Sequence, residues 1–275
     1  MQKKIRAGRA LLYIILVFWA VFMIMPFAWM LLTSVKTQPE AMKVPIVWLP
    51  KNPQWKNYVD VLQKYRFASY YKNTAFVTVT TVIFQLMTCS MGAYAFARLD
   101  FPGKNAIFLV CMTVLMVPTQ MIIIPRFIMT MRLGWLNSFA GIIIPNLPSI
   151  YGVFFLRQNF MTLPRELDEA AMIDGCSFFG IYWRILLPLL KNGLIAFGVR
   201  TTLWSWNEML WPLIVTSKQS LYVLSITLAN MQGQYAQKIP TQMAAGVLAM
   251  APMLLVFLIG QKQMLEGIAL SSIKA

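Results

Sequence analysis

The chain has 275 residues, of which 59% are hydrophobic and only 12% are charged. A soluble domain carries about 25% charged residues, so this composition indicates an integral membrane protein. The formal net charge of +15 does not indicate nucleic-acid binding, because the lysines and arginines lie between apolar runs and not on one basic face. Histidine is absent, which removes the commonest metal ligand and general base, and neither a metal site nor a cofactor is expected.

The first predicted domain covers residues 1–72. Its apolar run at 11–32 is long enough to cross about 30 Å of hydrocarbon as a helix. The run is too long for a signal peptide and lacks a cleavage pattern of small residues, so it indicates a retained transmembrane helix with a cytoplasmic N-terminus. The polar segment 36–72 is rich in proline, tryptophan and tyrosine, and is predicted to be extracytoplasmic, with short helices against the membrane face.

Residues 73–275 are predicted to form a five-helix core, which gives an all-α membrane protein with six transmembrane helices. The five helices are expected at 73–97, 105–131, 137–158, 194–214 and 242–262, with an outer loop at 215–241. Prolines interrupt the stretches 105–131 and 137–158, and broken helices of this kind belong inside a bundle or along a cavity.

The helix expected at 73–97 carries polar residues at steps of three and four, which places them on one helical face. They are Thr74, Thr78, Thr81, Gln85 and Thr88. Such a stripe is predicted to turn toward other helices or toward a wet pathway. The alternative is that each threonine bonds to its own helix.

An acidic stretch at 162–188 separates the helices expected at 137–158 and 194–214. Thr162 is predicted to cap a first short helix, and Gly175 to end it in the left-handed conformation that costs glycine little. Ser177 is predicted to cap a second short helix, which Pro188 ends. The stretch therefore reads as a helix-turn-helix inserted between membrane spans.

The same stretch matches the EAA loop, in which Glu-Ala-Ala, a glycine and an Ile-x-Leu-Pro group recur at fixed spacing. The matching residues are Glu169, Ala170, Ala171, Gly175, Ile185, Leu187 and Pro188, flanked by Asp174. The chain thus resembles the permease subunits of binding-protein-dependent ABC importers. The segment from Trp206 to Pro212 is similar to the corresponding segment of importers for carbohydrates. Among these importers, the chain resembles the shorter permease of maltose-type heterodimers.

The resemblance implies that the EAA loop is a cytoplasmic coupling helix, seated in a groove of a separate ATPase. Glu169 would offer a charge to that groove, Ala170 and Ala171 would allow close approach, and Gly175 beside Asp174 would set the turn. Leu187 and Pro188 would start the connection to the next span. No phosphate-binding loop of the G-x-x-x-x-G-K-[ST] type occurs, so ATP hydrolysis is expected on a nucleotide-binding subunit and this chain is not expected to be an enzyme.

Further partners implied are a second permease subunit, an extracytoplasmic solute-binding protein and the lipid bilayer. The expected location is the plasma or inner membrane, crossed several times, with both termini cytoplasmic. Basic residues divide almost equally between the two predicted sides, so this orientation depends on the basic N-terminus and on the resemblance.

A substrate pathway for sugars needs aromatic faces and hydrogen-bonding groups in a concave site. Arg200, Trp204, Asn207 and Trp211 share one face of the helix at 194–214, with Glu208 beside it. Together with Gln85 and Thr88 they are the candidate pathway residues. The alternative is that Trp211 anchors the helix at the interface and Arg200 extends to the cytoplasmic face.

Three other functions remain open from the sequence. An importer of the same class could carry an amino acid, a polyamine or phosphate. An integral membrane enzyme would need paired catalytic groups, whereas Arg200 and Glu208 are isolated within their span. A channel or scaffold would not need a fully matched EAA loop.

Overall fold

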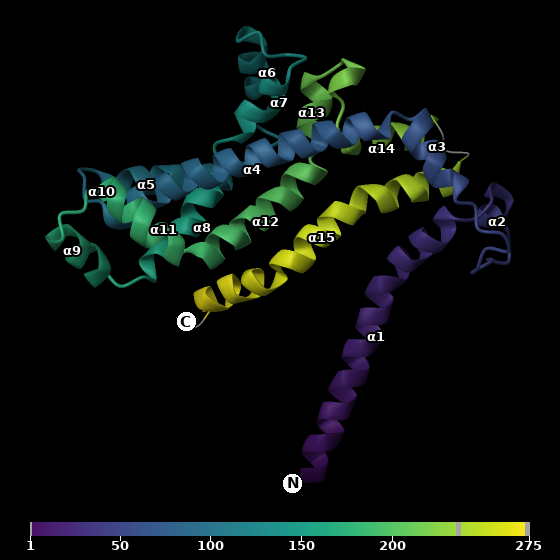
Figure 1. Cartoon of the computed structure of the whole chain (residues 1–275), viewed down its shortest axis with the longest axis horizontal. Helices are drawn as coiled ribbons and strands as arrows, with labels where there is room; N and C mark the ends of the chain where they lie inside the picture. Colours follow the sequence, from purple (N-terminus) through teal and green to yellow (C-terminus); the bar gives the residue numbers. More distant parts are fainter. Residues whose placement is uncertain (1, 235–237, 273–275) are drawn as a thin grey trace. The chain divides into compact units, whose positions relative to one another are not determined.

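The computed structural model describes residues 2–234 and 238–272, with side chains for 12–231 and 238–264. All regular elements in these ranges are helices (Figure 1), so the predicted all-α class is confirmed for the described residues. The chain forms two compact units. Unit 1 comprises Met1–Ala68 and Thr227–Ala251, and unit 2 comprises Ser69–Ile226 and Pro252–Ala275.

Unit 1 begins with α1 (Gln2–Ser34), followed by the short helices α2 (Gln38–Met42) and α3 (Lys56–Lys64). The short helices predicted for the polar segment are thus confirmed. A capping box between Thr37 and Glu40 starts α2. The backbone N–H groups of Thr37 and Lys51 donate to the Glu40 carboxylate and hold its pKa below the usual value. This contribution to stability is present at neutral pH and is lost only as the pH falls through the lowered pKa.

Polar and aromatic contacts attach the segment after α1 to the end of that helix. Asn57 donates from Nδ2 to the carbonyl oxygens of Ser34 and Lys36, at 2.9 and 3.0 Å. The Nζ of Lys36 lies 4.0 Å from the centre of the Trp29 ring, and Trp48 meets the same ring edge-on. These contacts hold the segment after α1 against the C-terminal end of that helix.

Unit 2 starts with the long helix α4 (Phe67–Arg98), whose first two residues belong to unit 1. The elements that follow are α5 (Lys104–Thr113), η1 (Val114–Met116), α6 (Ile123–Arg132), α7 (Phe139–Ile143), η2 (Ile144–Asn146), α8 (Ile150–Met161), α9 (Glu166–Ile173), α10 (Phe178–Gly180), the π-helix η3 (Ile181–Leu186), α11 (Leu187–Leu189), α12 (Lys191–Asn207), α13 (Leu210–Val215) and η4 (Gln219–Leu221). Helices α14 (Leu224–Gln234) and α15 (Ile239–Ser272) have residues in both units.

Three helical segments are long and apolar enough to cross a membrane: Leu12–Ser34, Phe67–Arg98 and Ile239–Met264. Two bent pairs bring the number to five if each counts as one span. They are Phe139–Asn146 with Ile150–Met161, bent by 43°, and Phe178–Leu189 with Lys191–Asn207, bent by 78°. The described residues thus give three to five spans, and the count of six stays a prediction.

Two predicted helices are interrupted where proline or polar residues break the backbone ladder. The stretch 105–131 is broken, as its prolines predict, because residues 117–122 around Pro118 separate η1 from α6. The prediction of a single helix at 194–214 is wrong, since α12 ends at Asn207 and α13 begins at Leu210. Glu208 ends the helical conformation there, with an extended backbone.

The outer loop predicted at 215–241 is largely helical in its described part. Helix α14 begins at Leu224, which is 1% exposed, and Val223 and Ile226 are buried beside it. Burial of these apolar side chains, which the polar composition of the whole segment obscured, accounts for the difference. Residues 235–237 of that prediction lie outside the described residues.

The described part of unit 2 contains a larger and a smaller hydrophobic core. The larger one joins α4, α8, α12 and the short helices from α9 to η3, and centres on Leu156, Phe160 and Leu186, each 0% exposed. The smaller one joins α4, α7 and α13 around Ile142, Trp211 and Val215. The larger core thus packs the acidic stretch directly against the long helix.

Candidate functional site

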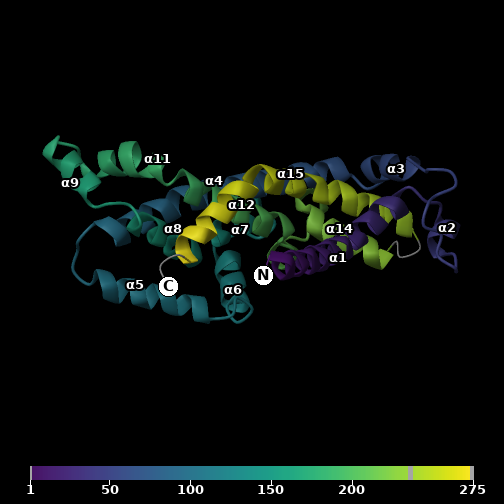
Figure 2. The ribbon, with the colours of Figure 1, turned by 90° about the horizontal axis from the view of Figure 1, so that it is seen from below.

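The acidic stretch forms a hairpin at one end of unit 2, built from α9, α10, η3 and α11 (Figures 1 and 2). We call residues 166–189 the acidic hairpin. Its first helix has three acidic side chains in its first turn, near the positive end of the helix dipole. The turn after α9 uses Gly175 at φ +81°, as predicted, because glycine adopts this left-handed conformation without strain.

Of the two helix N-caps predicted for this stretch, the one at Ser177 is right and the one at Thr162 is wrong. Ser177 accepts a hydrogen bond from the Gly180 N–H and caps α10, as predicted. Thr162 is not an N-cap. It is the C-cap of α8, and its hydroxyl donates to the Asn159 carbonyl oxygen at 2.8 Å, while α9 starts only at Glu166.

The second helix ends at Leu189, one residue after the predicted end at Pro188. Pro188 lies inside α11, and the preceding residues 181–186 widen into a π-helix. The Leu187 N–H bonds to the Tyr182 carbonyl oxygen, five residues back. Proline cannot donate to the carbonyl four residues earlier and its ring crowds that group, so the wider turn lets the helix continue through Pro188.

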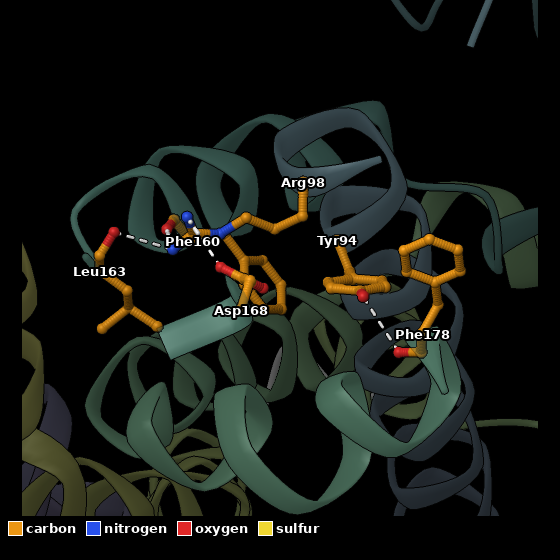
Figure 3. Close-up of polar contacts among 6 residues, drawn as sticks. All are labelled: Tyr94, Arg98, Phe160, Leu163, Asp168 and Phe178. Carbon is orange, nitrogen blue, oxygen red and sulfur yellow. Dashed lines mark hydrogen bonds and ion pairs between the residues drawn. The ribbon is translucent and has the colours of Figure 1, made fainter. Parts of the chain in front are cut away.

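Three side chains of α4 hold the acidic hairpin. Ser90, Tyr94 and Arg98 are spaced by four residues and therefore share one face of the helix. The Ser90 hydroxyl lies 2.8 Å from the Tyr182 hydroxyl, and the Tyr94 hydroxyl donates to the Phe178 carbonyl oxygen at 3.0 Å. Figure 3 shows the Tyr94 contact beside that of Arg98. We call these three residues the α4 anchor row.

Arg98 makes more polar contacts than the other two residues of the α4 anchor row. Its Nη2 donates to the carbonyl oxygens of Phe160 and Leu163, both at 2.8 Å, and its Nη1 lies 3.2 Å from Oδ2 of Asp168 (Figure 3). The Arg98 and Asp168 side chains are only 5% and 13% exposed. A single guanidinium therefore ties the end of α8, the connection after it and α9 to the end of α4.

Sequence reasoning missed the anchor row and the part that Asp168 plays in holding the hairpin. A signal was present in the sequence. Ser90, Tyr94 and Arg98 recur at a helical repeat within an apolar span, and such polar groups need partners inside a membrane.

The signature residues divide between an exposed and a buried side of α9. Ala171 is 4% exposed and packs into the larger core of unit 2, so its small side chain allows the hairpin itself to pack closely. Glu169, Ala170 and Asp174 are exposed, and Ile173 beside them is 86% exposed. Ile173 thus places an apolar side chain between two exposed carboxylates. We call these four residues the docking face, after the role proposed below.

Leu187 and Pro188 lie where the hairpin turns into α12. Leu187 packs against the larger core and Pro188 is exposed. The helical segments on the two sides of this connection are bent by 78°. The two residues thus form the joint between the acidic hairpin and the next long helix.

Three of the seven candidate pathway residues use their polar groups inside the fold. Gln85 is 4% exposed and donates from Nε2 to the Asn146 carbonyl oxygen at 2.7 Å. Trp211 is 3% exposed and donates from Nε1 to the Gly141 carbonyl oxygen at 2.9 Å. The Glu208 carboxylate accepts from the Trp211 backbone N–H and starts α13. The polar groups of these three residues therefore form hydrogen bonds within unit 2.

The other four candidates are exposed: Thr88, Arg200, Trp204 and Asn207. Thr88 and Asn207 each bond to a carbonyl four residues back in their own helix. The Arg200 guanidinium carbon lies 3.8 Å from the centre of the Tyr151 ring, which holds that charge over an aromatic face. Trp204 is 40% exposed and lies one turn away from Arg200.

The polar stripe on α4 is buried over most of its length. Thr74, Thr78, Thr81 and Gln85 are at most 4% exposed, whereas Thr88 is exposed. The stripe therefore turns inward, as predicted for its first four members. Thr74 bonds both to its own helix and to another one, because its hydroxyl donates to the Tyr70 carbonyl oxygen and accepts from the Leu224 N–H.

Replacing Asp168 by Asn should loosen the acidic hairpin, because the buried Arg98 charge loses its carboxylate. The expected loss is about 3 kcal/mol of unfolding free energy for the purified chain in detergent. The matched control is Asp100→Asn, which breaks the Lys104–Asp100 pair at the same end of α4. The Asp100 side chain is 84% exposed, and this control should lose less than about 0.5 kcal/mol.

Amide hydrogen exchange locates the effect. Faster exchange across α9 in Asp168→Asn, with the control unchanged, is the expected result. Equal exchange in the two variants would show that the ion pair does not hold the hairpin.

Comparison with known proteins connects this arrangement to transport systems. The chain is 32% identical over 252 residues to the arabinooligosaccharides transport system permease protein AraQ of Bacillus subtilis, covering 90% of each chain. It is 28% identical over 268 residues to the diacetylchitobiose uptake system permease protein NgcG of Streptomyces coelicolor, covering 96% of this chain and 88% of that one.

A solved structure has the same fold. It is a bacterial ABC transporter involved in the import of the acidic polysaccharide alginate, and one of its chains aligns with a TM-score of 0.83 at 22% identity, over 94% of this chain and 96% of that one. Residues 87–265, which include the acidic hairpin and every candidate pathway residue except Gln85, match the family described as binding-protein-dependent transport system inner membrane component. This chain therefore belongs to the family of inner membrane components of binding-protein-dependent transport systems.

Proposed function

We propose that the chain is the permease subunit of an ABC importer that takes up a sugar or oligosaccharide delivered by a binding protein. The observation that carries this proposal is similarity over nearly the whole chain to permeases named for saccharide uptake. The relatives include proteins for arabinooligosaccharides and for diacetylchitobiose, each aligned over 90% or more of this chain. The full set of EAA signature residues agrees with this class of transporter.

The same similarities weigh against the alternative functions. An amino acid, a polyamine or phosphate remains the second candidate cargo, but the relatives reported above are named for saccharides. They are also named as transport permeases, so the chain is a transport subunit and not an enzyme. ATP hydrolysis then belongs to a separate nucleotide-binding subunit.

The proposed topology has six membrane spans, with both termini and the acidic hairpin in the cytoplasm. Four spans follow from the three long helices and the bent pair Phe139–Asn146 with Ile150–Met161, and a fifth would be made by α12 with α13. The sixth would be made by α5 with η1 and α6, a helix broken around Pro118. The proposed division is a domain of residues 1–72, with the first span and an extracytoplasmic segment, and a five-span core of residues 73–275.

The proposed coupling works through the two sides of α9. The docking face would sit in the groove of an ATPase, with Glu169 and Asp174 meeting basic residues there. On the opposite side, Arg98 and Asp168 join α9 to α4 across a separation of 3.2 Å. When the ATPases close, a movement of the docking face would pass into α4 through this buried contact. A second permease subunit would supply the other half of the pathway.

The proposed pathway surface is the exposed face of α12, with Thr88 on α4. Trp204 and Asn207 offer an aromatic face and an amide, the two kinds of group that recognise sugars. Arg200 extends this surface by one turn and is held over Tyr151. Gln85, Glu208 and Trp211 would support the wall of the pathway through the hydrogen bonds that they make inside unit 2.

Glu169→Lys should abolish retention of the ATPase when this chain is purified with its co-expressed ATPase and partner permease. The change reverses an exposed charge at the centre of the docking face and sets it against a basic groove. The matched control is Glu166→Lys, which makes the same charge change at an exposed position of α9 outside the signature. Loss in both variants, or in neither, would move the docking surface away from Glu169.

Uptake by vesicles tests the cargo. The complex is reconstituted with its binding protein, and uptake of a labelled arabinooligosaccharide is expected only with ATP inside and binding protein outside. Uptake of an amino acid in its place would overturn the saccharide assignment.

Trp204→Ala should reduce the rate of sugar uptake by about tenfold, the effect of losing about 1.4 kcal/mol of aromatic contact. Trp19→Ala, on the exposed surface of α1, should leave the rate unchanged.

A further inference from the structure

A basic cavity of about 370 Å³ lies at the C-terminal end of α4, where that helix meets the start of α5 and the end of α8. Its lining residues are Phe96, Ala97, Arg98, Asp100, Lys104, Asn105, Arg157, Met161, Leu163 and Arg165. Four of these are cationic and one is acidic. The volume is enough for a phosphate group and its first ester substituents, since one water takes up about 30 Å³ in the liquid.

Two of the four cations are already neutralised by carboxylates. Arg98 is paired with Asp168, and Lys104 lies 3.2 Å from Oδ1 of Asp100. Arg157 and Arg165 have no carboxylate partner among the described side chains. The cavity therefore holds two positive charges that nothing in the described part of the chain compensates, which favours an anionic ligand.

Arg157 is held in place for such a ligand. Its Nε donates to the Phe96 carbonyl oxygen at 3.1 Å, and its guanidinium carbon lies 4.2 Å from the centre of the Phe108 ring. These contacts fix the plane of the guanidinium and use its Nε–H. Its terminal nitrogens make no hydrogen bond within the described residues, and they present the forked pair of donors that matches phosphate oxygens.

The backbone adds to the positive potential. Helix α5 starts at Lys104, whose N–H donates to the Phe101 carbonyl oxygen, and the N-cap Gly103 offers no side chain to the next N–H groups. Asn105, in this first turn, lines the cavity. The unpaired donors and the positive end of the helix dipole thus meet the arginine side chains at the same place.

The next turns of α5 make an exposed apolar surface beside the cavity. Ile107, Leu109 and Val110 are 48%, 67% and 66% exposed. In a multi-pass membrane protein, such exposed apolar side chains contact acyl chains. A ligand that joins a phosphate to acyl chains would satisfy both surfaces at once, whereas a free phosphate would use only the first.

We propose that the basic cavity binds the phosphate of an anionic phospholipid, with Arg157 and Arg165 as its ligands and the acyl chains along α5. The assignment to the cytoplasmic leaflet rests on the proposed function, which puts this end of α4 in the cytoplasm. The headgroup lies beside Arg98, the residue that ties the acidic hairpin to α4.

The test is lipid retention by the full chain, purified with its partner permease and analysed by native mass spectrometry. Phosphatidylglycerol and phosphatidylcholine are added as competing probes. The wild type should retain phosphatidylglycerol about tenfold better, which is the size of effect expected from hydrogen bonds to a charged group. The double variant Arg157→Gln/Arg165→Gln should lose this preference.

The matched control is Arg184→Gln/Lys191→Gln, which removes two exposed positive charges from outside the cavity. The control should keep the preference. A loss of preference equal to that of the cavity variant, or no preference in the wild type, would overturn the proposal. If the double variant does not fold, Arg165→Gln alone replaces it, because that side chain is exposed.

A second arm separates the lipid from soluble phosphate. Inorganic phosphate is titrated while thermal unfolding is measured. Stabilisation of the wild type by phosphate, absent in the cavity variant and without any preference for phosphatidylglycerol, would overturn the lipid assignment. The assay needs neither ATP nor sugar, so its failure leaves the uptake result untouched, and failed uptake leaves lipid retention measurable.

Discussion

The buried contact between Arg98 and Asp168 is the interaction on which the working end of the molecule depends. Both side chains are largely removed from solvent, and an isolated charge at either position would be costly. The guanidinium also binds two carbonyl oxygens at the end of α8 and just beyond it. The guanidinium thereby has three partners, and the segment that contains them, 160–168, is held at the end of a long helix that precedes it by more than 60 residues.

Around this contact, the residues of the EAA signature differ in their structural roles. Ala171 packs inward against the larger core, Gly175 allows the turn, and Glu169 remains exposed. The buried side therefore fixes the hairpin to α4, while the exposed side is left for the ATPase contact that we propose. The proposed coupling needs both properties, because a docking surface can pass on force only if its own attachment is rigid.

The sequence was sufficient for the class of fold and for the hairpin turn, because apolar length, a left-handed glycine and a serine cap act locally. It failed where tertiary contacts decide. Thr162 has the right chemistry for an N-cap but closes α8, and Pro188 is tolerated because a π-helix precedes it. Gln85 and Trp211 resembled pathway residues, yet their polar groups bond inside unit 2. The partners of Arg98 lie more than 60 residues away and leave no local pattern.

The central claim is that the acidic hairpin and α4 move as one body during the transport cycle. Spin labels at two exposed positions outside the docking face, Met91 on α4 and Met172 on α9, measure it in the assembled complex after the native cysteines have been replaced. We predict a narrow distance distribution that is the same with and without ATP, and a broad one in Arg98→Gln. A distance that changes with nucleotide in the otherwise unaltered complex would contradict the account.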